Sequence, residues 1–463
     1  MNFSSQPGRD RFRILLYSRN GKQLLLERNA QGFALPNVRI PSYTRVAQQI
    51  NRAIWKDWRL PSFCLFPVAD ANSLAYAVEL CGAVSTHPAN MNWFPVDSLA
   101  ERDFPEAQDF HAIETATQLF DQYRNAGAAW PFGKFGWLQD LTEWVESQAT
   151  QIGLHLTGNI EQFNASPTFS LVRFETNGAA VWFKAVGEPN LREYPITLAL
   201  AQYFPAFVPR IIATREDWNG WLSVEVQGTH PTEDSSIGVW TRVTTTLAEL
   251  QIASIGQTLQ LLNARCRDAR VCSLQELVEP FFEVMAEFME WQAIESPPAL
   301  SRNELLTLRT HLQSALAEAA DSEIPNTIGH FDFNPGNIVA NRDRCIFLDW
   351  AEASAGSPFL TFRYLLEHLG RIRQHDESWE RALTAAYADR WFSFFSPDEI
   401  ARTMRTSSLL AVFAYAACGD VWRDPACRHQ PEIPRLFRSL TRRMKRESDL
   451  LMAEDARSVP CLR

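Results

Sequence analysis

The residues with the clearest chemical potential stand close together in the second half of the chain. His330, Asp332 and Asn337 occur in the order H-x-D-x-x-x-x-N, and Asp349 follows at the end of a short apolar run. An amide oxygen and a carboxylate are ligands that suit Mg²⁺ when phosphates and water complete its shell. A further carboxylate can orient a hydroxyl group and accept its proton. The pattern therefore predicts Asn337 and Asp349 as metal ligands and Asp332 as the proton acceptor.

A β-hairpin would bring these groups together. The polar stretch after Ala340 is expected to form its turn, and the apolar run that begins at Cys345 its second strand. If Ala340 faces Cys345 across that turn, Asn337 lies beside Asp349. Asp332 precedes Asn337 by five positions, across a loop with a proline and a glycine, so it can approach the same point from the other side.

An ordinary polar turn in a hairpin would use the same residue types. In that alternative, Asp332 and Asn337 make only local backbone hydrogen bonds, and His330 is a core histidine with satisfied ring nitrogens. Single residues of these types would favour that alternative. All four residues occur at these spacings, and an apolar strand leads to Asp349. Together they favour the interpretation as a catalytic and metal-binding site.

This stretch resembles the aminoglycoside phosphotransferase and choline kinase family of small-molecule kinases. The family motif runs H-G-D-x-H-P-G-N, then I-D-W, then G-x-P; this chain has HFDFNPGN from His330, LDW from Leu348 and GSP from Gly356. Phe331 stands in place of the usual glycine, and Asn334 in place of the usual histidine. Neither residue is one that contacts phosphate or metal, so the two departures bear on the shape of the loop and on the substrate.

The resemblance implies a protein-kinase-like fold and a transfer of the γ-phosphate of ATP, with Mg²⁺, to a hydroxyl of a small molecule. Asp332 would be the catalytic carboxylate and His330 would brace its loop, while Asn337 and Asp349 would bind the metal. Thr361 stands near a position where the family often has an acidic residue. This departure bears on how the following helix is positioned. A protein kinase fits less well, because no A-P-E triplet follows.

Length and charge limit the classes of partner. The chain has 463 residues, which favours two or three compact units, and 46% of them are hydrophobic and 21% charged, as in globular proteins. The formal net charge of −10 argues against nucleic acid or an anionic membrane as the main partner. An anionic nucleotide would therefore be held by local positive charge.

The cysteines and the amino terminus indicate a cytoplasmic protein. The eight cysteines form no C-x-x-C pair, so we expect reduced, mostly buried thiols. The amino terminus lacks the apolar core of a signal peptide. The longest uninterrupted apolar run, Leu409 to Cys418, is too short to span a bilayer and fits a buried helix.

Residues 1–125 are expected to form a small α+β domain. An Asn20-Gly21 pair between alternating strands indicates a hairpin, and a helix is predicted over Thr44 to Trp58. This order resembles the Nudix fold, with that helix in the place of the family's catalytic helix.

The metal-binding glutamates of the Nudix motif are mostly absent. The positions that hold Gly, four Glu and a final Gly in the family carry here Val38, Thr44, Ala53, Lys56, Asp57 and Arg59. One carboxylate cannot build a multi-metal site. The leading domain is therefore expected to serve packing, substrate gating or the contacts of a possible homodimer, and nucleotide hydrolysis is the less favoured alternative.

After a Gly- and Pro-rich linker at 126–137, residues 138–228 are expected to form a β-rich, kinase-like amino-terminal lobe of three successive antiparallel strands and a helix. Lys184, on the third strand, is placed to reach the α- and β-phosphates of a nucleotide. Glu193, on the helix, is its expected partner, with Glu188 as a rival in the loop. The alternative is a surface lysine and a glutamate that favours a helix start.

Two further segments are predicted to contact the nucleotide. The turn around Ser166 stands in place of the glycine-rich loop of protein kinases and would offer backbone N–H groups and the Ser166 hydroxyl. The resemblance also implies that Glu225 and Val226 join the lobes and bond adenine through their backbone. By composition alone, the strand that leads to them is an ordinary buried strand.

Residues 229–463 are expected to form a helical carboxy-terminal lobe that holds the catalytic hairpin, with one helix over Val239 to Asn263. The predicted fold is thus α+β: a bilobal protein-kinase-like fold preceded by a Nudix-like domain. A non-catalytic nucleotide-binding module remains the alternative to an active kinase, although the complete set of core residues counts against it.

Overall fold

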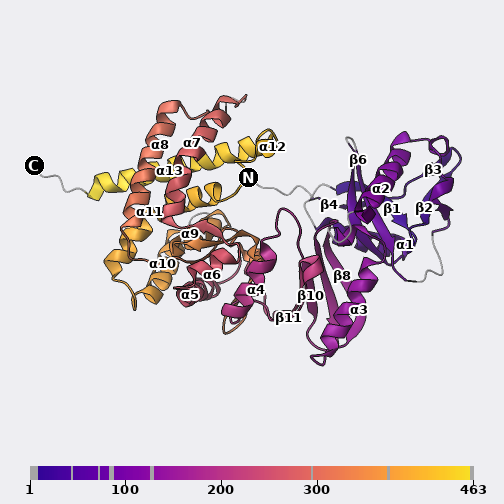
Figure 1. Ribbon diagram of the computed structural model, residues 1–463, viewed down its shortest axis with the longest axis horizontal. Helices are drawn as coiled ribbons and strands as arrows, with labels where there is room; N and C mark the ends of the chain where they lie inside the picture. Colours follow the sequence, from indigo (N-terminus) through magenta and orange to yellow (C-terminus); the bar gives the residue numbers. More distant parts are fainter. Residues whose placement is uncertain are drawn as a thin grey trace, which may run out of the picture. The chain divides into compact units, whose positions relative to one another are not determined.

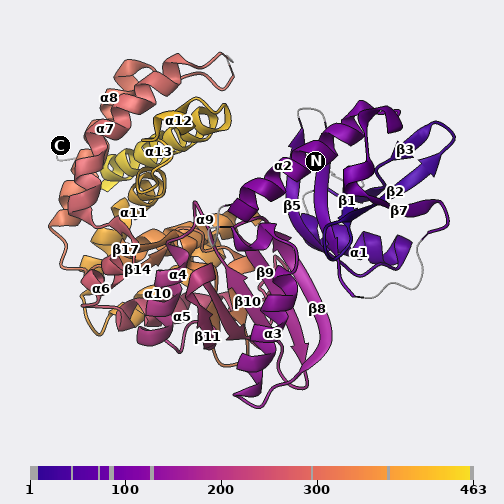
Figure 2. The same ribbon diagram turned by 45° about the vertical axis from the view of Figure 1, so that its right-hand side comes forward.

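The computed structural model describes residues 9–42, 45–70, 73–82, 88–125, 130–293, 296–372 and 376–458. The chain divides into two compact units, whose elements are labelled in Figure 1 and Figure 2. Unit 1 comprises Met1–Tyr194 and Arg210–Glu225, and unit 2 comprises Pro195–Pro209 and Val226–Arg463. The chain therefore leaves unit 1 inside helix α4, returns to it, and leaves it again after Glu225.

Unit 1 begins with a mixed sheet, here called the leading sheet. Its strands run in the order β3-β2-β1-β6-β5, with β4 paired to β1 and β7 to β2. They are β1 (Arg9–Tyr17), β2 (Gln23–Asn29), β3 (Gly32–Ala34), β4 (Asn37–Pro41), β5 (Ser62–Asp70), β6 (Ser73–Leu80) and β7 (Met91–Pro95). β1 and β2 pair antiparallel, as the Asn20-Gly21 turn predicts, whereas β1 and β6 pair in parallel.

Helices cover both faces of the leading sheet. The helices of unit 1 are α1 (Val46–Trp58), α2 (Ala107–Asn125), α3 (Trp137–Thr150) and the start of α4 (Glu193–Tyr203), with short 3-10 turns η1 (Val96–Ser98), η2 (Glu101–Asp103), η4 (Pro131–Gly133) and η5 (Glu216–Trp218). Ile14 and Leu16 pack with α1, whereas Leu15 and Tyr17 pack with α2. Successive strand residues point to opposite faces, so α1 and α2 lie on opposite sides of β1 (Figure 2). Thr44, the predicted start of the first helix, lies outside the described residues.

The second sheet of unit 1 has the order β11-β12-β10-β9-β8. Its strands are β8 (Leu156–Ala165), β9 (Ser170–Thr176), β10 (Val181–Ala185), β11 (Ile211–Arg215) and β12 (Gly220–Val224). Neighbouring strands are antiparallel throughout this order. The predicted succession of three antiparallel strands and a helix is confirmed as β8, β9, β10 and α4.

The two sheets of unit 1 share one hydrophobic core. Leu15 of β1, Phe120 of α2, Leu141 of α3 and Phe183 of β10 belong to the same cluster of buried side chains. Phe132 lies in this cluster as well, so the described part of the predicted linker is packed into the core. The predicted domain boundaries remain predictions.

Unit 2 is mainly helical. Its helices are α5 (Ile237–Ala253), α6 (Thr258–Asn263), α7 (Val271–Glu290), α8 (Arg302–Ala320), α9 (Pro358–Ile372), α10 (Glu377–Trp391), α11 (Pro397–Ala417), α12 (Pro425–Arg428) and α13 (Glu432–Ser458). A small sheet runs in the order β13-β17-β14, from β13 (Arg267–Ala269), β17 (Ala353–Gly356) and β14 (Thr327–His330). A separate hairpin consists of β15 (Ile338–Ala340) and β16 (Cys345–Phe347), flanked by the 3-10 turns η6 (Pro335–Asn337) and η7 (Trp350–Glu352).

The single helix predicted over Val239 to Asn263 is wrong, because the chain breaks between α5 and α6. Gly256 there adopts a φ of 80°, a left-handed conformation that ends helices. Beside it, the Ser254 hydroxyl donates to the Gln251 carbonyl at 2.7 Å and accepts from the Ile328 N–H at 2.9 Å. The break thus ties α5 to β14, the strand that leads into the candidate site.

The predicted α+β class is confirmed, with sheets concentrated in unit 1 and helices in unit 2. Among the described helices, none is long and apolar enough to cross a bilayer. The cysteines that the structure describes are free thiols.

Candidate active site

The β15–β16 hairpin of unit 2 has the predicted register. Ala340 faces Cys345, and Ile338 faces Phe347. The Leu348 N–H donates to the carbonyl oxygen of Asn337 at 2.8 Å, which extends the pairing by one step. This register places Asn337 opposite Leu348, the residue before Asp349, as the sequence predicts.

The residues between the two short sheets, 331–337, form what we call the catalytic loop, and its polar side chains bond to one another. Nδ2 of Asn337 donates to Oδ2 of Asp332 at 3.1 Å and to its carbonyl oxygen at 2.9 Å. Nδ2 of Asn334 donates to Oδ1 of Asp332 at 2.8 Å. Both oxygens of the carboxylate are therefore oriented, and the amide oxygen of Asn337 is the atom of that side chain suited to a cation.

His330 joins the catalytic loop to the end of the hairpin. Its Nδ1 accepts from the Asp332 N–H at 3.1 Å, so Nε2 carries the proton, and Nε2 lies 3.1 Å from the Leu348 carbonyl oxygen. The backbone N–H of His330 donates to the Thr361 hydroxyl at 2.8 Å. The side chain is 1% exposed, and burial lowers the pKa of His330 below its ordinary value. Because both nitrogens of the neutral imidazole have hydrogen-bond partners, His330 fixes the geometry of the catalytic loop.

Asp349 stands at an exposed and conformationally special position. It follows the buried strand β16 and adopts φ 59° and ψ 67°, the left-handed region that aspartate enters more readily than most residues. The next residue, Trp350, is buried and donates from Nε1 to the Phe347 carbonyl at 3.2 Å. The tryptophan anchors the chain, and the carboxylate remains accessible.

Phe331 attaches the catalytic loop to the helical part of unit 2. Its side chain is 2% exposed and belongs to the core cluster that includes buried residues of α7, α8 and α11. Nearby, the Tyr364 hydroxyl lies 3.5 Å from Oδ1 of Asp332, and burial, with the charge of Asp332 second, raises the pKa of Tyr364 to about 12. Tyr364 therefore stays protonated and can donate toward Asp332.

In unit 1, Lys184 pairs with Glu193. Nζ of Lys184 lies 2.5 Å from Oε1 of Glu193, and the two side chains are 13% and 2% exposed. Glu193 is the first residue of α4, whereas the rival Glu188 lies in the turn before the helix. The aromatic ring of Trp221, which faces Lys184 on β12, has its centroid 5.8 Å from Nζ.

The Ser166 hydroxyl is engaged inside its own turn. It accepts from the backbone N–H of Phe169 at 3.0 Å and of Thr168 at 3.4 Å, while the Ser166 N–H donates to the Phe169 carbonyl at 3.0 Å. Residues 165–169, here called the β8–β9 turn, thus form a compact structure stabilised by a side chain. Pro167 has no N–H, so the predicted phosphate contact would have to share the backbone N–H groups that already bond inside the turn.

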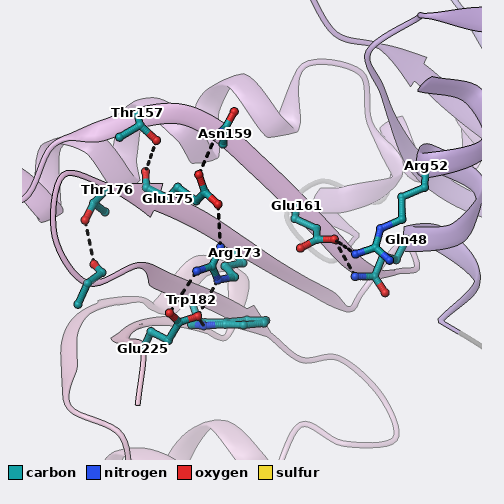
Figure 3. Close-up of polar contacts among 11 residues, drawn as sticks. Gln48, Arg52, Thr157, Asn159, Glu161, Arg173, Glu175, Thr176, Trp182 and Glu225 are labelled. Carbon is teal, nitrogen blue, oxygen red and sulfur yellow. Dashed lines mark hydrogen bonds and ion pairs between the residues drawn. The ribbon is translucent and has the colours of Figure 1, made fainter. Parts of the chain in front are cut away.

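Glu225 uses its backbone N–H and its side chain within unit 1. The N–H donates to the Ala180 carbonyl at 2.8 Å. The carboxylate accepts from Arg173 Nε at 2.6 Å and from Trp182 Nε1 at 3.0 Å (Figure 3). The hydrogen bond from Arg173 holds the pKa of Glu225 below its ordinary value. Val226, which follows, is the first residue of the returning part of unit 2.

Comparison with protein families identifies one stretch of the chain. The model of the phosphotransferase enzyme family matches residues 191–401. This stretch belongs to the phosphotransferase enzyme family. It contains the catalytic loop, the hairpin and Glu193, while Lys184 precedes it. The predicted family, and with it the class of kinase-type phosphotransferase, is confirmed.

Several solved kinases resemble the chain distantly. They include a choline kinase from Cryptosporidium parvum (TM-score 0.46, 10% identity, covering 68% of this chain and 97% of that one). An ethanolamine kinase from Plasmodium vivax gives a TM-score of 0.44 at 11% identity, covering 63% of this chain and 82% of that one. A choline kinase from Streptococcus pneumoniae gives 0.40 at 12% identity, covering 68% and 99%. No curated protein matches the sequence. The family assignment therefore rests on the phosphotransferase model.

Sequence reasoning gave no site role to two residues of the phosphotransferase stretch. Asn334 orients Asp332 directly, and Thr361, fully buried, bonds the backbone of His330. Both were noted only as departures from the family motif. The signal that could have found them is chemical: an amide can donate to a carboxylate, and a threonine hydroxyl can accept an N–H as an acidic side chain does.

Proposed function

We propose that this protein transfers the γ-phosphate of ATP to a hydroxyl group of a small molecule. The observation that supports this most strongly is the orientation of Asp332 by the side-chain amides of Asn337 and Asn334. A carboxylate that is held from both oxygens and stands beside a hairpin ending in Asp349 has the residue types and order required for phosphoryl transfer.

Asp332 orients the acceptor hydroxyl and takes its proton late in the reaction, since the transition state for phosphoryl transfer is loose and positioning supplies most of the catalysis. The amide oxygen of Asn337 and the carboxylate of Asp349 are the groups that would hold Mg²⁺, which when bound offsets the charge of the phosphates. His330 acts through Asp332 and Leu348 as a positioning residue.

In unit 1, Lys184 would bind the phosphates of the nucleotide. Glu193 fixes the direction of the ammonium group, because its Oε1 lies 2.5 Å from Nζ of Lys184. The backbone of the β8–β9 turn, which contains Ser166, would contact phosphate oxygens. The Glu225 carbonyl and the backbone of Val226 would bond adenine.

The test measures ADP release from ATP across a panel of hydroxylated small molecules, with wild type and Asp332→Asn compared. For the acceptor that the wild type uses, the variant should lose roughly 10²- to 10⁴-fold in rate while it still binds MgATP, because a general base and not a nucleotide contact is removed.

Asp343→Asn is the matched control. Asp343 lies exposed in the turn of the same hairpin, and its substitution should leave the rate unchanged. Undiminished transfer in Asp332→Asn would contradict the assigned role. Binding of MgATP without transfer to any hydroxyl would instead indicate a nucleotide-binding module.

A further inference from the structure

The β8–β9 turn of the second sheet is held from outside by the leading part of the chain. The Tyr76 hydroxyl, on β6 of the leading sheet, donates to the Ala165 carbonyl at 2.9 Å. The Phe132 N–H donates to the Pro167 carbonyl at 3.2 Å. On another side, Gly187 approaches so closely that a Cβ there would overlap Thr168. Because the Ala165 and Pro167 carbonyls are bonded to groups outside the turn, the turn is held in one position.

The end of β8 is also joined to the edge of the leading sheet by a side chain. Oε1 of Gln162 accepts from the Cys64 N–H at 2.9 Å, and its Nε2 donates to the Cys64 carbonyl at 2.8 Å. Cys64 lies on β5, at one end of the strand order of that sheet. Gln162 thus bonds the edge strand as a neighbouring peptide group would, and it is 2% exposed. The register shift between Gln162 and Asn164 marks an irregularity in β8 at this point.

Helix α1, which stands in the place of the catalytic helix in the predicted Nudix-like resemblance, contacts β8. Nε2 of Gln48 and a guanidinium nitrogen of Arg52 reach Oε1 of Glu161 at 2.8 and 2.5 Å (Figure 3). Nδ2 of Asn51 donates to Oε1 of Gln162 at 2.9 Å. Gln48, Asn51 and Arg52 of this helix thus contact β8, the strand that leads into the β8–β9 turn.

We infer that the leading sheet and α1 position the nucleotide-binding turn of the phosphotransferase, and that the Tyr76 hydroxyl is the positioning group. This inference rests on the proposed function, in which the turn contacts nucleotide phosphates. The N–H groups of Ser166 and Phe169 are bonded inside the turn, so a phosphate oxygen would have to share them in the geometry that the turn already has. A turn that is held in that geometry before binding orders at a lower cost in free energy. The leading part of the chain supplies that order through contacts with residues 161–167.

Loss of the Tyr76 hydroxyl should loosen the turn without removing a packing group. In Tyr76→Phe, the half-buried Ala165 carbonyl loses its donor, and a hydrogen bond of this kind corresponds to about a 3- to 10-fold change in an equilibrium. The amides of Ser166 and Phe169, which bond inside the turn, should therefore exchange with solvent about 3- to 10-fold faster. The KM for ATP should rise by a similar factor, with kcat and the KM for the acceptor unchanged.

Tyr17→Phe is the matched control. Tyr17 lies in the shared core of unit 1, and its buried hydroxyl has no hydrogen-bond partner among the described residues. Its removal should change neither the exchange rates of the turn nor the KM for ATP. Thermal unfolding of both variants verifies that each is folded.

Hydrogen exchange measured without nucleotide, together with the KM for ATP, decides the inference. Faster exchange at Ser166 and Phe169 and a raised KM for ATP in Tyr76→Phe alone would support it. Unchanged values in Tyr76→Phe, or equal changes in Tyr17→Phe, would overturn it. If the wild type does not bind MgATP, the proposed function fails and the inference fails with it; the exchange rates would still reveal whether Tyr76 orders the turn.

Discussion

The catalytic loop of unit 2 and the β8–β9 turn of unit 1 are ordered in different ways. In the catalytic loop, residues 331–337, polar side chains bond to one another and to Asp332, with Asn334, Asn337 and His330 as the partners. In the β8–β9 turn, residues 165–169, one serine bonds within the turn, while Tyr76 and Phe132 hold its carbonyls from distant parts of the chain. The carboxylate of Asp332 is thus oriented from within its own loop, whereas the carbonyls of the β8–β9 turn are held by groups outside it.

The largest expected effect on nucleotide binding concerns Asp349, the proposed metal ligand at the end of the β15–β16 hairpin. Asp349→Ala should abolish the increase in Tm that MgATP gives, because metal and phosphate are held together; a ligand at 100 times its Kd stabilises by about 2.7 kcal/mol. Thermal unfolding with and without MgATP measures this, and Asp343→Ala, in the exposed turn of the same hairpin, should keep the full shift. An unchanged shift in Asp349→Ala would show that the metal is bound elsewhere.

The largest expected loss of stability is at Lys184 of unit 1. Lys184→Met leaves the Glu193 carboxylate, 2% exposed, without its lysine, and breaking a buried pair costs about 3–5 kcal/mol. The double variant Lys184→Met with Glu193→Gln should recover much of this loss in urea unfolding, since the buried negative charge is removed together with the lysine. Neither variant should bind MgATP as the wild type does. Equal destabilisation of the single and double variants would argue against a buried charge pair.

The stability of unit 1, which supports the β8–β9 turn, should depend on pH through Glu79 of β6. Its carboxylate accepts from the Gly136 N–H at 3.0 Å, and burial raises the pKa of Glu79 to about 7 from 4.5. Between about pH 4.5 and 7 the unfolded chain loses this proton and the folded chain keeps it. The free energy of unfolding should therefore fall as pH rises through that window, by on the order of 3 kcal/mol.

Glu79→Gln removes that titration. Its urea-unfolding free energy should vary less across the window than that of the wild type, and the variant should be the more stable protein at pH 8. The opposite result would be a free energy of unfolding that rises between pH 5 and 7 in the wild type and does not rise in Glu79→Gln. It would contradict the argument that burial raises the pKa of Glu79.

The smallest effect is expected at Thr361, which anchors the catalytic loop from α9. Thr361→Val removes the acceptor of the buried His330 N–H, at a cost of about 1–3 kcal/mol in urea unfolding. Thr244→Val is the matched control, because the Thr244 hydroxyl is buried without a hydrogen-bond partner in the described part of the chain. Equal stability of the two variants would show that the His330 bond is not needed.

The difference between local contacts and contacts with distant segments also explains which features could be predicted from the sequence. The register of the β15–β16 hairpin follows from local alternation and turn residues, so the placement of Asn337 beside the residue before Asp349 could be predicted. Lys184 and Glu193 are nine positions apart on adjacent elements, and their pairing was also within reach.

Contacts that join distant segments had no such local signal. Tyr76 and Ala165 are 89 positions apart, and Gln162 bonds Cys64 across 98 positions. The break between α5 and α6 was missed because apolar periodicity continues through it. The Nudix-like resemblance of the leading domain remains a prediction, although its helix α1 is now seen to contact β8.

The most direct test of the proposed reaction identifies where the phosphate goes. Wild-type protein, MgATP and the best acceptor of the panel are incubated, and the products are followed by phosphorus NMR. We predict a new phosphomonoester signal on the acceptor that grows in step with ADP, and that grows roughly 10²- to 10⁴-fold more slowly with Asp332→Asn. Inorganic phosphate as the only product, or no consumption of ATP with any hydroxylated molecule, would contradict the assignment of a phosphotransferase.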